Sequence, residues 1–395
     1  MQDEITDARR KKRRKYKLKR LLRFTFALAL VLIAVILVNT VTVTTFNDIK
    51  DGLTTFFTFS GGYPAELGKS SPTQVAQMSQ AYAVVTENEF IIKSQSGKNL
   101  FYENHGFVSP YIAASGNRAV LYNRASKDVR VYNRTGPVAE LKTDFSIVDL
   151  DISSNGMLGV LTQSDRYMSE LAIYQNGKYE KVMTWKGAAG FPISTSMSDN
   201  GSSAAVASVI ARNGKIYTTI TSIDVARQSQ RYETEISGLC VKLICENDGS
   251  VTMITDESAV RVVTDGTVKN TYTFGDVPLL FFAKDKGNKI ALGFGDNSRP
   301  AINSVLILNS NLEVTVTIEN CGIIKDIYLS SNRLYILGNK FVTAYSMAGE
   351  AVKTYDADPR ALNLVEFSSI MEILPDRVQK LDEHKSEENN DVADT

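Results

Sequence analysis

Few residues in this 395-residue chain have the types and spacing that catalysis or metal binding requires. Only two histidines occur, and His384 lies in a polar C-terminal stretch, so His105 has no second histidine with which to hold a metal. An isolated histidine in a turn usually has a structural role. No nucleophile-elbow pattern presents a serine, although a Ser-His-Asp arrangement assembled by the fold stays an open alternative. We expect no catalytic residue, no cofactor and no metal.

The three cysteines are the other reactive side chains. Cys240 and Cys245 lie in one predicted strand, where a spacing of five points their side chains to opposite faces and prevents a mutual disulfide. Cys321 lies near the start of another predicted repeat. Because three is an odd number, we expect buried free thiols. Aspartates such as Asp248 and Asp265 are explained by turn chemistry without calcium.

Charge is distributed unevenly. Eleven of the 44 Lys and Arg residues lie between positions 9 and 23 without an acidic residue, whereas 33 basic residues face 41 acidic ones from Phe24 onward. The basic run leads into residues 24–38, in which Thr25 is the only polar side chain. We interpret residues 1–20 as a basic cytoplasmic segment and residues 21–43 as a transmembrane signal anchor. The residues that set its topology are Arg13, Arg14, Lys15, Arg20 and Arg23.

The length of the anchor fits a bilayer. A helix of 23 residues is about 34 Å long, and a hydrocarbon core is about 30 Å thick. A cleaved signal peptide is the alternative, but no small-x-small cleavage pattern follows Val38. Nucleic-acid binding is disfavoured because a basic run beside a membrane span is already explained by topology. The expected location is the cell membrane, with a single span, a cytoplasmic N-terminus and an extracytoplasmic C-terminal domain.

From residue 73 the chain consists of short runs of β-branched and aromatic residues closed by turn residues. Turn markers recur at intervals of 40, 45, 48, 38 and 45 residues, at Gly116, Gly156, Gly201, Gly249, Gly287 and Asn332. A second series, which includes Gly97, Gly136 and Gly177, lies between them. Two hairpin turns per period of about 40 residues indicate four strands per unit, which is the blade of an all-β propeller.

The number of blades follows from where the units begin. Seven begin near Thr73, Phe107, Phe145, Gly187, Gly238, Asp276 and Cys321, and an eighth begins near Pro359 but has only three strands. We expect residues 63–67 to supply its fourth strand, because a ring must leave no open edge. Eight blades are therefore predicted, with seven as the alternative. The predicted boundaries are a linker at 44–62, a propeller at 63–381 and an acidic disordered tail at 382–395.

Residues 113–121, 152–161 and 197–207 resemble the inner-strand hairpins of WD-repeat-like propellers. The whole layout resembles an uncharacterised family of membrane-anchored, quinoprotein-like propellers from Gram-positive bacteria. Shared features are the basic start, the anchor, the Tyr-Pro-Ala-Glu-Leu sequence at 63–67, His105 followed by Ser109-Pro110, and residues 167–174. The resemblance implies fold and topology and no activity, because that family has no assigned catalytic residues.

Two classes of propeller enzyme require sequence motifs that this chain lacks. Sialidase-like propellers need Ser-x-Asp-x-Gly-x-x-Trp boxes, and residues 198–201 have a different spacing and no tryptophan. Quinone-dependent propellers need several docking tryptophans, and Trp185 is the only tryptophan. We therefore expect a non-catalytic module.

One face of the ring is the predicted binding surface. In a four-stranded blade, the connections between the second and third strands gather opposite the short hairpin turns, and we expect them to be longer and more polar. The candidate residues on this face are Arg124, Lys127, Asp128, Asp165, Arg166, Tyr167, Arg212, Lys215, Asp296 and Arg299. Solvated loops without a ligand are the plain alternative. Residues 63–67 should enter from the opposite, short-turn face and place the anchor there.

The resulting hypothesis is a protein-binding or scaffold module of the cell envelope, held in the lipid bilayer through residues 21–43 and bound to an envelope protein, with no nucleic-acid partner. Two alternatives stay open, a glycan-active hydrolase or lyase outside the cytoplasm and a small-ligand sensor.

Overall fold

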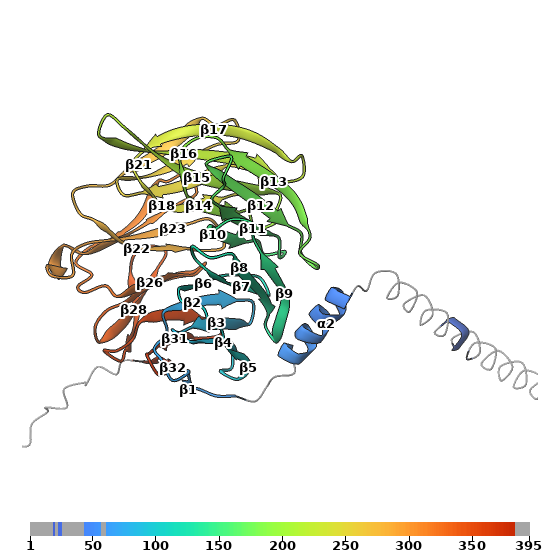
Figure 1. The fold of residues 1–395 in the computed structure, drawn as a ribbon. Helices are drawn as coiled ribbons and strands as arrows, with labels where there is room; N and C mark the ends of the chain where they lie inside the picture. Colours follow the sequence, from blue (N-terminus) through green and yellow to red (C-terminus); the bar gives the residue numbers. More distant parts are fainter. Residues whose placement is uncertain (1–18, 20–22, 26–42, 57–60, 384–395) are drawn as a thin grey trace, which may run out of the picture. The chain divides into compact units, whose positions relative to one another are not determined.

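Residues 61–383 form antiparallel sheets arranged as blades around an axis (Figure 1). The structure is a computed structural model that describes residues 19, 23–25, 43–56 and 61–383, and the chain divides into two units, Met1–Leu53 and Thr54–Thr395. The second unit holds eight blades, so the prediction of an eight-bladed all-β propeller is confirmed and the seven-bladed alternative is wrong.

Blades 1 to 4 follow the chain in order. Blade 1 contains β2 (Gln74–Met78), β3 (Ala81–Val85), β4 (Glu89–Ser94) and β5 (Asn99–Asn104). Blade 2 contains β6 (Pro110–Ser115), β7 (Arg118–Asn123), β8 (Asp128–Asn133) and β9 (Gly136–Lys142). Blade 3 contains β10 (Ile147–Ile152), β11 (Leu158–Thr162), β12 (Ser169–Tyr174) and β13 (Lys181–Gly187). Blade 4 contains β14 (Phe191–Met197), β15 (Ser203–Arg212), β16 (Lys215–Asp224) and β17 (Ser229–Ser237).

Blades 5 to 7 repeat the same order. Blade 5 contains β18 (Cys240–Cys245), β19 (Val251–Thr255), β20 (Ser258–Val262) and β21 (Val268–Thr273). Blade 6 contains β22 (Leu279–Lys284), β23 (Ile290–Phe294), the 3-10 turn η1 (Pro300–Ile302), β24 (Ser304–Leu308) and β25 (Val314–Ile318). Blade 7 contains β26 (Asp326–Leu329), β27 (Arg333–Leu337), β28 (Phe341–Ser346) and β29 (Ala351–Asp356).

Blade 8 joins the two ends of the ring. It contains β30 (Asn363–Glu366), β31 (Ile370–Ile373), β32 (Arg377–Lys380) and, as its outer strand, β1 (Ala65–Glu66). Ala65 pairs with Val378 and Glu66 with Arg377 in an antiparallel register. The predicted closure by residues 63–67 is therefore confirmed, although only two of these residues form the strand.

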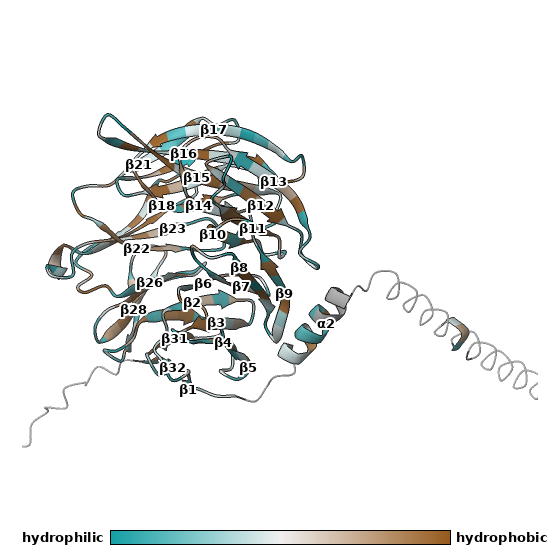
Figure 2. Ribbon diagram, viewed as in Figure 1, coloured by the Kyte–Doolittle hydropathy of each residue, from teal (hydrophilic) through white to brown (hydrophobic). Residues whose placement is uncertain are grey.

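The apolar core lies between the blades. In the described part of the chain, eight hydrophobic clusters occur, one between each pair of neighbouring blades. Second strands such as β3, β11 and β23 are buried at every position because both of their faces pack against adjacent sheets. Figure 2 accordingly shows brown segments in the strands of the ring, while the exposed outer strand β17 is teal over much of its length. Each blade thus depends on its neighbours for burial.

Much of the predicted linker at 44–62 lies in a helix, α2 (Val43–Phe56), which the sequence analysis did not predict. Its apolar residues Phe46, Ile49, Leu53 and Phe56 recur at helical intervals, a pattern that our reading of the Thr/Phe-rich composition overlooked.

The predicted anchor at 21–43 lies almost wholly outside the described residues, as do Arg13, Arg14, Lys15 and Arg20, while the described residues 23–25, which include Arg23, are helical. No helix among the described residues has the length and apolar composition needed to cross a membrane.

The predicted tail boundary moves by two residues. Strand β33 (Asp382–Glu383) pairs with Tyr355 and Asp356 of β29, so blade 7 gains a fifth strand. Backbone hydrogen bonding at the edge of a sheet can include charged residues that a composition-based boundary assigns to a tail. Residues 384–395 of the predicted tail lie outside the described residues.

Candidate binding face

The antiparallel order of the strands defines two faces of the ring. We call the loop face the one that carries the connections between second and third strands and the connectors between blades. Its segments include residues 105–109, 124–127, 143–146, 163–168, 188–190, 213–214, 238–239, 274–278, 295–303, 319–325, 338–340 and 357–362. The turn face carries the remaining hairpin turns. All ten predicted binding residues lie on or directly beside the loop-face connections.

The expected length of these connections is right for three blades and wrong for the others. Residues 124–127, 163–168 and 295–303 form long connections, whereas those of blades 1, 5, 7 and 8 contain two or three residues. Threonine hydroxyls close two short ones, since Thr86 Oγ1 accepts the Glu89 amide and Thr255 Oγ1 accepts the Ser258 amide. In blade 4, Arg212 and Lys215 flank a two-residue Asn213-Gly214 turn, so long strands rather than a long loop project there.

Arg124 and Lys127 are held by the neighbouring blade. Arg124 Nε donates a 2.9 Å hydrogen bond to the Val148 carbonyl, and its guanidinium lies 4.7 Å from the centre of the Tyr111 ring. Lys127 Nζ donates a 2.6 Å hydrogen bond to the Asp144 carbonyl. These cations therefore fasten blade 2 to blade 3 and do not point freely toward a partner.

The other candidates form separate local pairs. Arg212 forms an ion pair with Glu235, and Arg299 Nε lies 3.1 Å from Asp296 Oδ2. Hydrogen bonds from Ser298, and the Arg299 guanidinium, hold the pKa of Asp296 below its usual value. Lys186 Nζ lies 4.9 Å from the Tyr167 ring. Asp128 accepts a hydrogen bond from Ser126, while Asp165, Arg166 and Lys215 are exposed. The structure thus places the predicted residues on one face without bringing them into one site.

Sequence reasoning missed the apolar side chains of this face. Of the sixteen large hydrophobic residues exposed within 61–383, twelve lie on the loop face or at the strand ends that meet it. These are Val108, Tyr167, Met168, Phe191, Ile216, Leu239, Val241, Leu280, Ile302, Ile323, Phe341 and Leu362. Phe191 and Phe341 begin strands, and Ile216, Val241 and Leu280 are the second residues of theirs, so the sequence pattern did not distinguish them from buried strand residues.

Two hollows lie on the loop face. One, of about 340 Å³, is lined by Arg124, Gln163, Phe191, Pro192 and Ile193 together with Ala125 and residues 146–148. The other, of about 350 Å³, is lined by Cys321, Ile323, Ile336, Thr343 and Tyr345 together with residues 338–341. Each contains exposed apolar residues, so each can take an apolar side chain of a binding partner.

The longest loop is fixed by asparagine side chains. Asn303 is fully buried, and its Nδ2 donates to Asn297 Oδ1 and to the Gly322 carbonyl while its Oδ1 accepts the Asp296 amide. Asn297 in turn donates to the Ile324 carbonyl and accepts the Ile324 amide. The loop at 295–303 is therefore held against the connector between blades 6 and 7.

Carboxylates on the inner strands accept hydrogen bonds from backbone amides on the inner strand of the next blade. Asp149 Oδ2 accepts the Thr195 amide at 3.0 Å, and Asp151 Oδ2 accepts the Met197 amide at 2.8 Å. Asp326 Oδ2 likewise accepts the Leu364 amide at 2.8 Å. Each carboxylate lies on the inner strand of one blade and each amide on the inner strand of the next, so side chains satisfy an edge that no further strand can cover.

These carboxylates lie in different electrostatic surroundings. Burial raises the pKa of Asp151, and the positive charge of Lys242 acts in the opposite direction. Burial raises the pKa of Asp326 to about 6. Asp149 receives hydrogen bonds from Tyr122 and Ser194 and lies 4.0 Å from the Arg124 guanidinium. No group of three or more His, Cys, Asp or Glu within the described ranges is arranged to hold a metal ion.

His105 and the cysteines have structural surroundings. His105 is buried, its Nδ1 accepts the Phe107 amide, and its Nε2 lies 3.2 Å from the Thr86 carbonyl, so the expected structural role is confirmed. Cys240, Cys245 and Cys321 are free thiols, as predicted, but Cys240 and Cys321 are only partly buried. Burial raises the pKa of Cys240 to about 12 and that of Cys321 to about 11, so neither is ionised near neutral pH.

Comparison with solved structures identifies the same architecture. The chain superposes on yeast Sqt1 (Saccharomyces cerevisiae) with a TM-score of 0.58 and 10% identity, over 82% of this chain and 99% of Sqt1. It superposes on BamB of Moraxella catarrhalis with a TM-score of 0.51 and 10% identity, over 80% of this chain and 96% of BamB. Such low identities establish the fold alone.

Sequence comparison identifies a family without an assigned activity. No curated protein matches the chain in sequence. A family of unknown function, DUF5711, matches residues 63–382, which is the whole propeller from the closing strand to β33. The chain therefore belongs to the DUF5711 family.

Proposed function

We propose that the protein is a single-pass membrane protein that displays a non-catalytic, protein-binding propeller outside the cytoplasm of a Gram-positive bacterium. Residues 21–43 are the anchor in this proposal, residues 1–20 stay in the cytoplasm, and an envelope protein is the partner. The basic run before an apolar stretch supports this orientation.

The observation that carries the binding role is the gathering of exposed apolar side chains on the loop face. Val108 is 95% exposed and Phe191 is 53% exposed, and ten further large apolar residues are exposed on the same face. Apolar side chains exposed to water are costly, and where several gather on one face of a domain they can serve as anchors for a protein partner. The surrounding ion pairs, such as Arg299 with Asp296, provide the polar rim that interfaces have.

The path of the chain directs this face away from the point of entry. Tyr63 Oη donates a 3.0 Å hydrogen bond to the Gln95 carbonyl, in a hairpin turn of the turn face. Strand β1 then runs toward the loop face, where residues 67–73 lead into β2. The chain therefore enters the propeller at the turn face, opposite the loop face.

The binding role is tested by crosslinking in intact membranes. A photoreactive residue at position 191 should form a discrete crosslinked product, and the same residue at position 268, an exposed valine of the outer strand β21, should not.

With the partner identified, Phe191→Ser combined with Met168→Ser should weaken binding at least tenfold, because buried aromatic and apolar anchors dominate interface energies. Val268→Ser is the matched control. Charge reversal of Arg166 and Arg299 should also weaken binding, and unchanged binding in both variants would contradict the loop face as the interface.

The topology is tested by labelling with a membrane-impermeant maleimide. Lys127→Cys places an exposed thiol on the loop face, and the three native thiols give little background because they are buried or half-buried. In intact cells this variant should be labelled, whereas Gln2→Cys should be labelled only after lysis. Labelling of Gln2→Cys without lysis would reverse the proposed orientation.

A further inference from the structure

The hairpin turns of the turn face are hydrogen-bonded from blade to blade through much of the ring. The Ser79 amide donates to the Gly116 carbonyl at 2.6 Å, which joins blades 1 and 2. Ser115 and Ser154 share a 3.1 Å hydroxyl contact between blades 2 and 3, and the Ser154 amide donates to the Asp199 carbonyl of blade 4. The Asn200 amide donates to Asn247 Oδ1 of blade 5 at 3.0 Å. These bonds close the turn face from blade 1 to blade 5.

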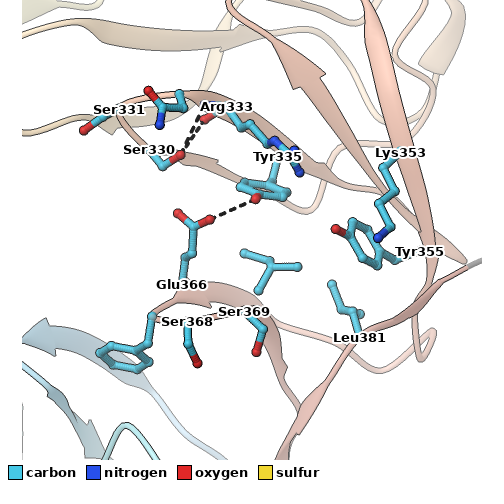
Figure 3. Close-up of a pocket in the computed structure, with 13 residues that line it drawn as sticks. Ser330, Ser331, Arg333, Tyr335, Lys353, Tyr355, Glu366, Ser368, Ser369 and Leu381 are labelled. Atoms are coloured by element: carbon cyan, nitrogen blue, oxygen red, sulfur yellow. Dashed lines mark hydrogen bonds between the residues drawn. The ribbon is translucent and has the colours of Figure 1, made fainter.

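The same face is open between blades 7 and 8. Among residues 61–383, no hydrogen bond joins the turn at 330–332 to the turn at 367–369. Strands β30, β31 and β32 have only four residues each, so blade 8 leaves space beside its neighbour. A cavity of about 600 Å³ occupies this space, and Figure 3 shows the side chains around it. A cavity of this volume is in the range that small ligands fill.

The wall of the cavity is rich in hydroxyl groups. Its uncharged polar lining consists of Ser330, Ser331, Asn332, Ser368 and Ser369 together with Tyr335 and Tyr355. Ile370, Leu381 and Phe367 supply apolar surface. Hydroxyl groups both donate and accept hydrogen bonds, so such a lining suits a ligand that carries hydroxyls of its own.

Charged groups of both signs line the cavity. Tyr335 Oη donates a 2.9 Å hydrogen bond to Glu366 Oε1, so this carboxylate already has a partner (Figure 3). The Glu366 backbone is also fixed, because its carbonyl accepts Gln77 Nε2 of blade 1 at 2.7 Å. The Arg333 backbone bonds to Ser330, but within the described part of the chain no carboxylate pairs with its half-buried guanidinium. Lys353, whose Nζ lies 5.2 Å from the Tyr355 ring, adds a second positive charge.

We propose that the cavity between blades 7 and 8 binds a small hydroxylated anion of the sugar-acid class. The ligand carboxylate pairs with the Arg333 guanidinium, which presents a planar pair of donors that matches a carboxylate. The sugar hydroxyls bond to the serine and tyrosine hydroxyls of the wall. This site lies on the turn face and does not depend on the proposed partner of the loop face.

Isothermal titration of the full-length protein with three probes tests the proposal. Glucuronate should bind, whereas glucose, which lacks the charge, and inorganic phosphate, which lacks the ring hydroxyls, should each bind at least tenfold more weakly. Absence of glucuronate binding would overturn the proposal. Phosphate binding as tight as that of glucuronate would overturn its sugar component.

Two substitutions in the cavity should change the affinity for glucuronate in opposite directions. Arg333→Gln should weaken glucuronate binding at least tenfold. Glu366→Gln keeps an acceptor for Tyr335 but removes the negative charge, so it should tighten glucuronate binding severalfold. Arg227→Gln, in an exposed hairpin turn of blade 4, is the matched control and should leave this binding unchanged. Thermal unfolding of each variant checks that the ring is intact, and an intact Arg333→Gln variant that binds as tightly as the parent would contradict the assignment.

Discussion

The pKa of a side chain in this ring depends on the position of its strand within the blade, as Asp326 shows. It lies on an inner strand, burial raises its pKa to about 6, and hydrogen bonds from Leu364, Ile327 and Asn363 only partly oppose that shift. The folded state therefore binds more protons than the unfolded state between about pH 4 and pH 6. The contribution of Asp326 to stability is fully present below pH 4 and is lost as the pH rises through 6.

Asp326→Asn tests this sign. The amide keeps an acceptor for the Leu364 amide and removes the charge, so the variant should gain stability relative to the parent at pH 7.5 and not at pH 4. One pKa unit corresponds to about 1.4 kcal/mol, so the stability gain of the variant over the parent should be at most about 3 kcal/mol larger at pH 7.5 than at pH 4. Urea unfolding at both pH values measures it. An equal difference at the two values would show that the carboxyl has an ordinary pKa.

Gly295 lies so close to Asn303 that there is no room for a side chain at this position. A Cβ at this position would overlap Asn303 Oδ1 and approach Asn303 Cα to 3.0 Å. Gly295→Ala should lower the free energy of unfolding by about 1–3 kcal/mol, because Asn303 is buried and its displacement would break its bonds to Asn297 and Gly322. Denaturant unfolding measures the loss. Gly275→Ala, where no atom lies within 4 Å, should be close to neutral.

At the scale of the element, the inner strands of the ring are edge strands. Amides on their open edge are satisfied by side chains of the preceding blade, as Met197 is by Asp151 and Cys245 is by Ser196. Asp151→Leu should remove the acceptor and cost about 1–3 kcal/mol, since it leaves a buried amide without a partner. Amide exchange at Met197 should become at least tenfold faster. Asp151→Asn should keep most of the protection, and unchanged exchange in Asp151→Leu would contradict this role of the carboxylate.

The strands could be predicted from the sequence, but the side-chain hydrogen bonds between the inner strands of neighbouring blades could not. Gly116, Gly156 and Gly201 mark turns because each adopts a positive φ that other residues rarely adopt, so the period of the blades is visible in the sequence. Asp149 and Asp151 sit in an alternating strand like any surface pair, and their partners lie 46 residues away in the next blade. The cavity beside Arg333 depends on the short strands of blade 8, and no local pattern predicts it.

The whole molecule depends on one contact between distant parts of the chain. Eight clusters of apolar residues lie between blades, and the one between blades 8 and 1 contains Leu67 together with Tyr82, Val365 and Val378. Strand β1 completes this contact by pairing with β32 across about 310 residues of sequence. Closure explains why the three-stranded last unit predicted a partner upstream of the first blade. It also makes the ring sensitive to the loss of a few N-terminal residues.

Two shortened chains test this sensitivity. A chain of residues 61–383 should unfold near the temperature of the full propeller, whereas a chain of residues 68–383 should lose the Leu67 to Asp376 backbone bond and the burial of Ala65 and Leu67. These losses amount to about 3–6 kcal/mol. The unpaired edge of β32 should also promote association between copies. A peptide of residues 61–69 added in trans should restore the higher unfolding temperature, because it can occupy the vacant edge as a strand. Equal unfolding temperatures for the two chains would show that blade 8 is stable with three strands and that β1 does not hold the ring closed.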